Sequence, residues 1–243
     1  MKTLWFASCL VLVVAGVAQG AKIAYEGVDY LPSPLAPHGP AFGFAAPWAA
    51  DAGVVVQPPG LSSPLDLSST GLAVGGFFDF ICPLTNTIAP APGKEFWASV
   101  LIFHFGPNDQ TFMGLSPAGA ALGNVPAVAI GVRLGQYGIF QGGAFTPSGV
   151  AFTPAGATDF LVARFVAGGA TWNVSLWVNK PTTAVPDLVL NVAPVVYGTM
   201  VNQNQAEFSS DEFRLGETAG DVSVSGVVPT LDTTWGRLKA RFH

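Results

Sequence analysis

The chain has 243 residues, a formal net charge of −5, 50% hydrophobic residues and only 10% charged residues. Such a composition is too apolar for a disordered chain, and an acidic chain without a basic run argues against nucleic acid and anionic membranes as partners. The 29 glycines and 20 prolines exclude long helices and favour many short strands joined by turns, as in an all-β sandwich or barrel.

Residues 1–20 have the pattern of a secretory signal peptide. Lys2 precedes an apolar run that starts at Leu4, and the run ends in AQG, which places small residues at the two positions that a signal peptidase recognises. The run is too short to span a membrane, and no second apolar stretch of ~18 residues follows. We therefore expect a secreted protein without a transmembrane segment, cleaved after Gly20, whose residues 21–243 form a single domain.

Cleavage after the signal peptide would remove Cys9 and leave Cys82 as the remaining cysteine. A single thiol in a secreted protein is either buried or paired between chains. Because Cys82 follows the apolar run FFDFI, we expect it to be buried as a small hydrophobic side chain.

The first half of the mature chain predicts short strands between loops rich in proline and glycine. Residues 96–105, FWASVLIFHF, are apolar on both faces, which is typical of a central strand covered on both sides. Further strands are predicted at 22–27, 54–57 and 72–81, with loops at 30–48, 58–69 and 85–93.

The middle of the chain predicts a hairpin from the segments 127–134 and 137–141, with Gly135-Gln136 at the turn. A strand is expected before it and a long loop after it. The remaining assignments are strands at 111–115 and 189–196, a loop at 142–158 and a short helix within 230–242.

Residues 159–222 carry the strongest pattern. DFLVARF and TWNVSLWVNK alternate between two faces and are joined by VAGGA, which predicts an antiparallel hairpin from Phe160 to Val178. A polar loop and a third strand, FSSDEFRLG, follow. Phe213 and Leu215 should face the core, whereas Glu212 and Arg214 should form a solvated strand face.

These segments carry a family resemblance. LVARF, VSLWVNK and DEFRLGETAGDV resemble the C-terminal half of the secreted bacterial LamG-like proteins of the concanavalin A-like lectin/glucanase superfamily, and IAYEGVDY and HGPAFGFAAPW resemble the opening of the same group. The resemblance implies a two-sheet antiparallel jelly-roll β-sandwich that occupies nearly the whole mature chain. It is specific for the fold and says little about activity.

Catalytic motifs of this superfamily are missing from the sequence. Its glucanases carry Glu-x-Asp-x-x-Glu on one strand, because alternate positions place the acid and the nucleophile on one face at the ~5–5.5 Å that retaining hydrolysis needs. The chain has no such run, no Gly-x-Ser-x-Gly nucleophile elbow, no Gln-x-His arrangement of a jelly-roll lyase and no His-x-x-x-His or Cys-x-x-Cys zinc motif. No catalytic residue is predicted, although an enzyme with an unfamiliar site stays open as an alternative.

The predicted ligand site is the polar face of the hairpin. Trp177 shares one face of its strand with the polar residues Asn173, Ser175 and Asn179, which occupy every second position. Arg164 lies on the corresponding face of the neighbouring strand. An aromatic ring can cover the apolar face of a sugar, amides can bond its hydroxyls, and a guanidinium can bind an acidic sugar. The competing interpretation is that Trp177 packs under a loop.

No cofactor is indicated by the sequence. Calcium needs only 6–8 oxygen ligands, so Asp109 with Asn108, and Asp211, stay open as ligands, although a lone Asp in a turn usually shapes the turn. The leading hypothesis is a non-catalytic extracellular module that binds glycans or takes part in adhesion. The alternatives are a self-associating structural surface protein and a carbohydrate-active enzyme with a non-standard site.

Overall fold

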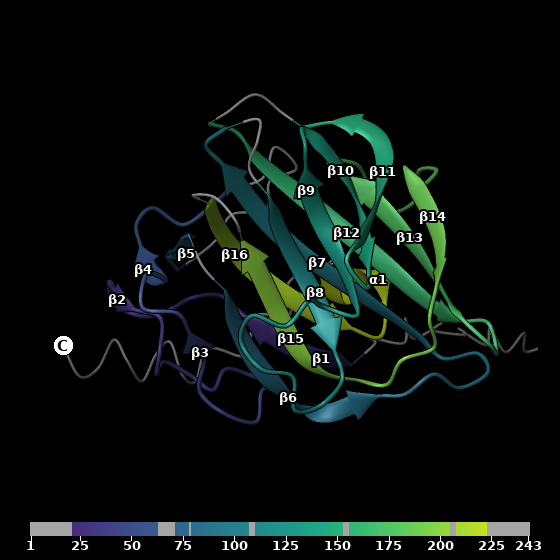
Figure 1. Cartoon of the computed structure of the whole chain (residues 1–243), viewed down its shortest axis with the longest axis horizontal. Helices are drawn as coiled ribbons and strands as arrows, with labels where there is room; N and C mark the ends of the chain where they lie inside the picture. Colours follow the sequence, from purple (N-terminus) through teal and green to yellow (C-terminus); the bar gives the residue numbers. More distant parts are fainter. Residues whose placement is uncertain are drawn as a thin grey trace, which may run out of the picture.

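The chain forms two antiparallel β-sheets packed face to face, as a computed structural model shows (Figure 1). The structure describes residues 21–62, 71–77, 79–106, 110–152, 156–204 and 208–222. The predicted signal peptide and the predicted C-terminal helix lie outside these residues. The predicted all-β class, a two-sheet antiparallel jelly-roll sandwich, is confirmed.

Nine strands of the described residues form one sheet and seven form the other. The nine-stranded sheet has the order β14-β13-β12-β7-β16-β5-β4-β2, with β1 also paired to β16, and the seven-stranded sheet has the order β11-β10-β9-β8-β15-β6-β3. The strands of the first sheet are β1 (Lys22–Glu26), β2 (Ser33–Pro34), β4 (Val55–Gln57), β5 (Ala73–Gly76), β7 (Glu95–His104), β12 (Thr158–Ala167), β13 (Trp172–Val178), β14 (Leu188–Val192) and β16 (Phe208–Gly216). Those of the second are β3 (Ala49–Ala50), β6 (Phe80–Ile88), β8 (Thr111–Ser116), β9 (Val128–Arg133), β10 (Gln136–Gln141), β11 (Ala144–Ala151) and β15 (Tyr197–Asn204), and one short helix, α1 (Ala219–Val222), follows β16.

The core lies between the two sheets and is rich in aromatic rings. Phe96 stacks on Phe165 at a centroid distance of 4.3 Å and meets Trp172 edge-on at 5.2 Å. Tyr197 joins this group from the opposite sheet, 6.0 Å from Trp172. Such offset and edge-on pairs add to the gain from buried area alone, so this cluster fixes how the two sheets stack.

The predicted hairpin is confirmed, because β12 and β13 pair from Leu161↔Val178 to Ala167↔Trp172. Its connection spans the four residues 168–171, with Gly169 at a φ of 78°. The β9–β10 hairpin is also present, although its turn is centred on Leu134 and Gly135, both at positive φ.

Predictions for one strand and for several loops were wrong. The segment 72–81 is split between the sheets, because the chain leaves β5 at Gly76, where φ is 140°, and enters β6 at Phe80. The predicted loops at 85–93 and 142–158 contain the end of β6 and all of β11. The polar loop before β16 contains β15, whose Asn202 and Asn204 are buried; a strand with buried amides lacks the apolar alternation that sequence reasoning needs.

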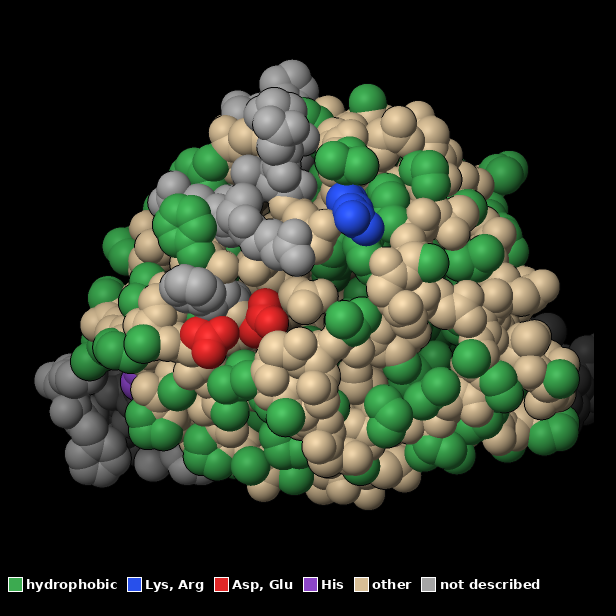
Figure 2. All heavy atoms as spheres, in the orientation of Figure 1, with side chains coloured by type: hydrophobic (Ala, Val, Ile, Leu, Met, Phe, Trp, Pro, Cys, Tyr) green, Lys and Arg blue, Asp and Glu red, His purple; other side chains and the backbone are tan. Residues whose placement is uncertain are grey.

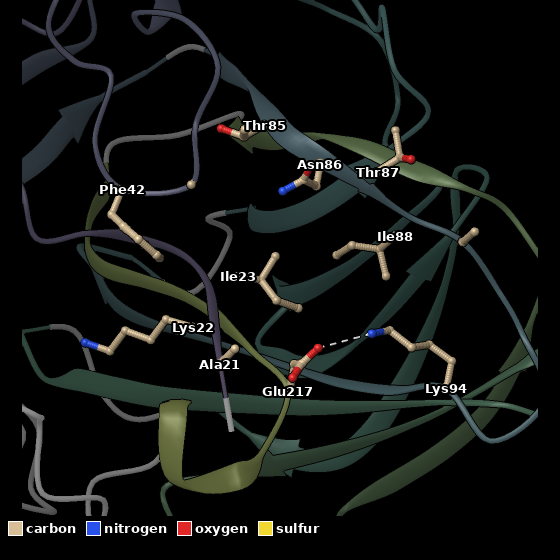
Figure 3. A pocket seen from close by; sticks show the side chains of 12 residues that line it. Ala21, Lys22, Ile23, Phe42, Thr85, Asn86, Thr87, Ile88, Lys94 and Glu217 are labelled. Atoms are coloured by element: carbon tan, nitrogen blue, oxygen red, sulfur yellow. Dashed lines mark hydrogen bonds and ion pairs between the residues drawn. The ribbon is translucent and has the colours of Figure 1, made fainter. Parts of the chain in front are cut away.

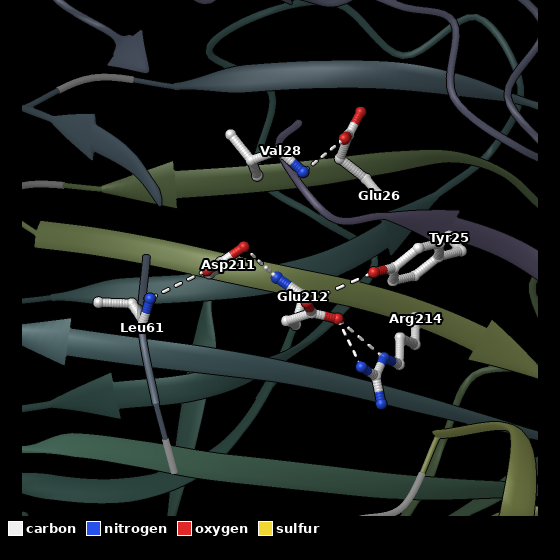
Figure 4. A network of polar contacts seen from close by, with 7 residues as sticks. All are labelled: Tyr25, Glu26, Val28, Leu61, Asp211, Glu212 and Arg214. Atoms are coloured by element: carbon white, nitrogen blue, oxygen red, sulfur yellow. Dashed lines mark hydrogen bonds and ion pairs between the residues drawn. The ribbon is translucent and has the colours of Figure 1, made fainter. Parts of the chain in front are cut away.

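The prediction that Glu212 and Arg214 form a solvated face was also wrong: they are 1% and 6% exposed. β16 bulges between Asp211 and Arg214, Glu212 has a φ of 53°, and β1 pairs alongside. The Arg214 guanidinium donates to Glu212 Oε2 at 2.5 Å, and the Tyr25 hydroxyl donates to Glu212 Oε1 at 3.3 Å (Figure 4). An added strand and a bulge therefore bury charges that alternation placed in water, while Phe213, as predicted, lies in the core.

Cys82 is buried, as the sequence predicted. Its thiol donates to the carbonyl oxygen of Ala46 at 3.1 Å. Burial, with a smaller contribution from the charge of Glu26, raises the pKa of Cys82 to about 12. Within the described ranges, no helix is both long enough and apolar enough to cross a bilayer.

Candidate functional site

The predicted ligand residues start from neighbouring positions on the outer face of the nine-stranded sheet. The register pairs Arg164 with Ser175, and Trp177 with Val162. Asn173 donates through Nδ2 to Asn191 Oδ1 at 3.1 Å, in an exposed contact with β14. The structure therefore brings Arg164, Ser175 and Asn173 onto one outer face, as the hairpin register requires.

Trp177 does not present a free ring on that face, because it is only 5% exposed. Its indole N–H donates to the carbonyl oxygen of Ala184, in the loop after β13, at 2.8 Å. Its ring stacks on Trp97 at 5.6 Å, within a second apolar cluster that also contains Phe160 and, from α1, Val222. The competing interpretation, a tryptophan packed under a loop, describes its position.

Asn179 lies at the end of the hairpin with its amide already bonded. Its φ is 51°, its Oδ1 accepts the Phe160 N–H at 2.8 Å, and its Nδ2 donates to Asp159. Asp159 is fully buried and also accepts the hydroxyl of Tyr137 from the other sheet. Asn179 therefore joins a polar contact between the sheets and lies apart from the predicted patch.

Arg164 is partly exposed, but its charge is already paired. Its guanidinium pairs with Glu95 at 2.5 Å, lies 5.5 Å from the ring centre of Trp97, and has a side chain that is 41% exposed. Burial alone would raise the pKa of the Glu95 carboxyl, but hydrogen bonds from Arg164 and Trp97, with the charge of Arg164, outweigh it and hold the pKa below its usual value. Glu95 thus already pairs with the Arg164 guanidinium, the group that was expected to bind an acidic sugar.

A groove of about 450 Å³ opens elsewhere, between β1 of one sheet and β6 of the other (Figure 3). Phe42 lies at one end of it and is 57% exposed. The exposed residues Thr85, Asn86 and Thr87 form one wall. Its other lining residues are Ala21, Lys22, Ile23, Gly43, Ile88, Ala89, Lys94 and Glu217.

The wall of hydroxyl and amide groups exists because β6 bulges. Tyr197 of β15 pairs with Ile88, but Thr199, two residues on, pairs with Pro83. Residues 84–87 therefore stand opposite the single residue Gly198, and the extra chain turns Thr85 to Thr87 outward. Bulges of this kind commonly re-aim side chains at sites.

The segment around Gly43 joins the two sheets below the groove. The carbonyl of Phe42 accepts the Tyr25 N–H of β1 at 2.9 Å, and the carbonyl of Gly43 accepts the Thr85 N–H of β6 at 2.8 Å. Gly43 has a φ of 79°, and a Cβ there would lie 2.0 Å from the carbonyl oxygen of Ile23. Only glycine allows this close approach, so Gly43 fixes the position of Phe42.

An ion pair lies at the end of the groove away from Phe42. Lys94 Nζ is 3.3 Å from Glu217 Oε1, and both side chains are more than a third exposed. The Glu217 N–H donates to the Ala21 carbonyl at 3.1 Å, which attaches this end to β1. The ammonium of Lys22 points away from Glu217 (Figure 3); burial and then the charge of Arg214 lower its pKa, against smaller opposite effects of Asp221 and Glu212.

The groove combines an aromatic ring, hydroxyls, an amide, one carboxylate and an apolar floor formed by Ile23 and Ile88. Sequence reasoning missed it, since its residues come from five separated segments and its wall fell in a predicted loop. Pro83 and the Thr-Asn-Thr run after Leu84 were the available signal of an irregular strand, because they break the apolar alternation of β6.

Metal ligation finds no support among the described side chains, where no three His, Cys, Asp or Glu residues gather. Asp211 accepts the N–H groups of Leu61 and Glu212 at 3.0 and 2.8 Å. Asn108 and Asp109, the other candidates for calcium, lie outside the described residues.

No protein-family model and no curated protein matches the chain, but solved structures do. Domain 4 of AbnA, a GH43 extracellular arabinanase from Geobacillus stearothermophilus in complex with arabinotriose, is 12% identical, with a TM-score of 0.46 over 84% of this chain and 97% of that one. The Ca²⁺/Man3GlcNAc-bound exoplasmic/lumenal domain of VIP36 is 10% identical, with a TM-score of 0.39; the match covers 70% of this chain and 82% of that domain. A sialidase is 14% identical, with a TM-score of 0.42 over 66% of this chain but only 17% of its own. At such scores, no residue role or ligand carries over from these proteins.

Proposed function

We propose that this chain is a secreted, non-catalytic jelly-roll module that binds glycans, and that the groove between β1 and β6 is its binding site. The observation that supports this most is the exposed ring of Phe42 beside Thr85, Asn86 and Thr87. An aromatic face covers the apolar face of a sugar, while amide and hydroxyl groups donate to and accept from its hydroxyls. A volume of about 450 Å³ suits a small ligand.

The non-catalytic part of the proposal rests on the carboxylates. Among the described residues that line the groove, Glu217 is the one carboxylate, and it pairs with Lys94. Glycoside hydrolysis by the common mechanisms needs two carboxyl groups on either side of the bond. We expect no release of reducing ends from polysaccharides that the protein binds; such release would contradict this part.

Secretion rests on the pattern of residues 1–20. Intact-mass analysis of protein from the culture medium should find Ala21 as the first residue. Protein that keeps Met1 or stays within the cells would contradict secretion without bearing on the groove.

The binding site is tested on a glycan array followed by calorimetry with the saccharide found. Phe42→Ala and Asn86→Ala should each weaken binding at least tenfold. Phe77→Ala is the matched control, because Phe77 is 53% exposed and does not line the groove. Arg164→Ala tests the patch predicted from the sequence: if this variant alone loses binding, the site lies on the nine-stranded sheet, and if no glycan binds, the proposed function is wrong.

A further inference from the structure

The strands at the ends of the two sheet orders differ in how their outer edges are protected. β2 and β3 have two residues each, and β2 includes Pro34. β11 contains Pro147, and its pairing with β10 shifts between Gln136 and Gly138. Short length, proline and bulges are the features by which natural sheets avoid pairing with other chains.

β14, the fourth end strand, has none of these features. Its sequence, LVLNV, contains no charge and no proline, and its five residues pair with β13 without a shift in register. Within the described parts of the chain, no strand pairs with its outer side. The edge therefore presents a row of backbone donors and acceptors that a further strand can pair with.

Exposed apolar side chains surround this edge. Val185, Val189 and Val196 are 81%, 50% and 45% exposed, and all three lie between residues 185 and 196. Figure 1 places β14 beside β11 at one flank of the sandwich, and Figure 2, in the same view, shows hydrophobic and uncharged side chains there. Apolar side chains that flank an open strand edge are typical of an interaction surface.

Charge repulsion at this edge is small. Asp187, which precedes β14, pairs with Lys180 at 2.6 Å and accepts the Val178 N–H at 2.9 Å. Its side chain is only 13% exposed. Two such edges can therefore approach one another without opposing like charges.

We propose that β14 pairs antiparallel with β14 of a second copy of this chain, about a two-fold axis at Leu190. The pairing is self-complementary, since Leu188 then lies opposite Val192, and Val189 opposite Asn191. Leu188, Leu190 and Val192 all face the core, so their copies extend one apolar layer across the axis. This inference does not depend on glycan binding.

The assembly closes as a dimer. Pro186 and Pro194 bound β14 and limit the length of the new ladder, while β11 on the same flank is protected. A two-fold contact uses the same surface of both copies and leaves none free for growth. Four strands, β13, β12, β7 and β16, lie between β14 and β1, so the pairing does not cover the groove of either copy.

Sedimentation of the secreted protein over a hundredfold range of concentration tests the pairing. We expect twice the mass of one chain, and Val189→Lys should shift the protein to single chains, because it places two cations diagonally across the new strand pair. Leu31→Lys is the matched control, because Leu31 is 82% exposed elsewhere, and it should stay dimeric. Circular dichroism checks that both variants fold, and Asn191→Lys repeats the test if Val189→Lys does not.

Cysteine crosslinking tests the register. Opposed residues of an antiparallel pair lie ~4.5–5.5 Å apart between Cα atoms, which suits a disulfide. Mixing Val189→Cys chains with Asn191→Cys chains should give a disulfide-linked pair, and neither variant should crosslink alone. Val125→Cys is the control, because Val125 is 52% exposed outside β14, and it should not crosslink. Single chains at every concentration, longer assemblies, or a dimer that survives both lysine variants would overturn the proposal; crosslinking of Val189→Cys alone would overturn the axis.

Discussion

Two clusters of aromatic and polar side chains on this sandwich differ in what covers them. On the outer face of the nine-stranded sheet, Trp177 stacks on Trp97, and the loop after β13 leaves it 5% exposed. In the groove between β1 and β6, Phe42 is 57% exposed beside Asn86. Alternation along a strand shows which side of a sheet a residue occupies, but not whether a loop later passes over it.

The largest expected difference between the two clusters is in how much their aromatic rings contribute to the stability of the fold. Trp177→Ala removes a buried ring and leaves the carbonyl of Ala184 without its indole donor, so we expect a loss of ~3–5 kcal/mol. Denaturant unfolding measures it. A loss below ~1 kcal/mol would show that the loop does not cover the ring in solution, and would return Trp177 to the group of candidate ligand residues.

Gly43 connects the two sheets below the groove, and its replacement should have the next largest effect on the free energy of unfolding. Gly43→Ala forces a Cβ to within 2.0 Å of the Ile23 carbonyl at a φ of 79°, so we expect a loss of ~1–3 kcal/mol and weaker glycan binding. Gly119→Ala is a matched control, since Gly119 has a φ of 81° with nothing within 4 Å. Equal losses in the two variants would mean that the close approach to β1 adds nothing.

Glu95 gives the covered face a pH dependence. Its pKa is lowered in the folded chain, so its stabilisation is present above the unfolded pKa of ~4.3 and is lost as the pH falls through the folded value. Because the ion pair with Arg164 is partly exposed, we expect at most about 1 kcal/mol. Unfolding free energies between pH 3 and 7 should fall less steeply for Glu95→Gln and for Arg164→Gln than for the parent; an unchanged slope in both would contradict this assignment.

Phe42 should have the smallest effect on stability. Phe42→Ala removes an exposed ring, so the unfolding free energy should change by no more than ~0.5 kcal/mol while glycan binding falls. A loss comparable to that of Trp177→Ala would show that Phe42 packs as a core residue, and the difference between the two clusters would disappear.

The sequence predicted the fold better than the site. The β12–β13 hairpin and the core position of Phe213 follow from local alternation and turn residues, and β7 follows from a run that is apolar on both faces; the structure contains all three. Glu212 and Arg214 could not be placed, because their burial depends on a bulge and on β1, nearly two hundred residues earlier in the chain. Local patterns carry no information on such distant pairing.

The groove shows the same limit. Asn86 and Thr87 fell in a predicted loop, and their outward orientation depends on which residue of β15 stands opposite. Lys94 and Glu217 meet only through tertiary contacts. By contrast, β14 was expected at roughly the right place, but that its edge lacks a partner strand follows only from the order of the whole sheet.

Chemical-shift mapping of the ¹⁵N-labelled protein with the saccharide from the array tests the assignment of the binding site most directly. We expect the largest changes at the backbone amides of Ile23, Gly43 and Thr85–Ile88, and none at Asn173, Ser175 and Trp177. Changes confined to Asn173, Ser175 and Arg164, with the groove amides unmoved, would contradict the assignment and place the site on the outer face of the nine-stranded sheet.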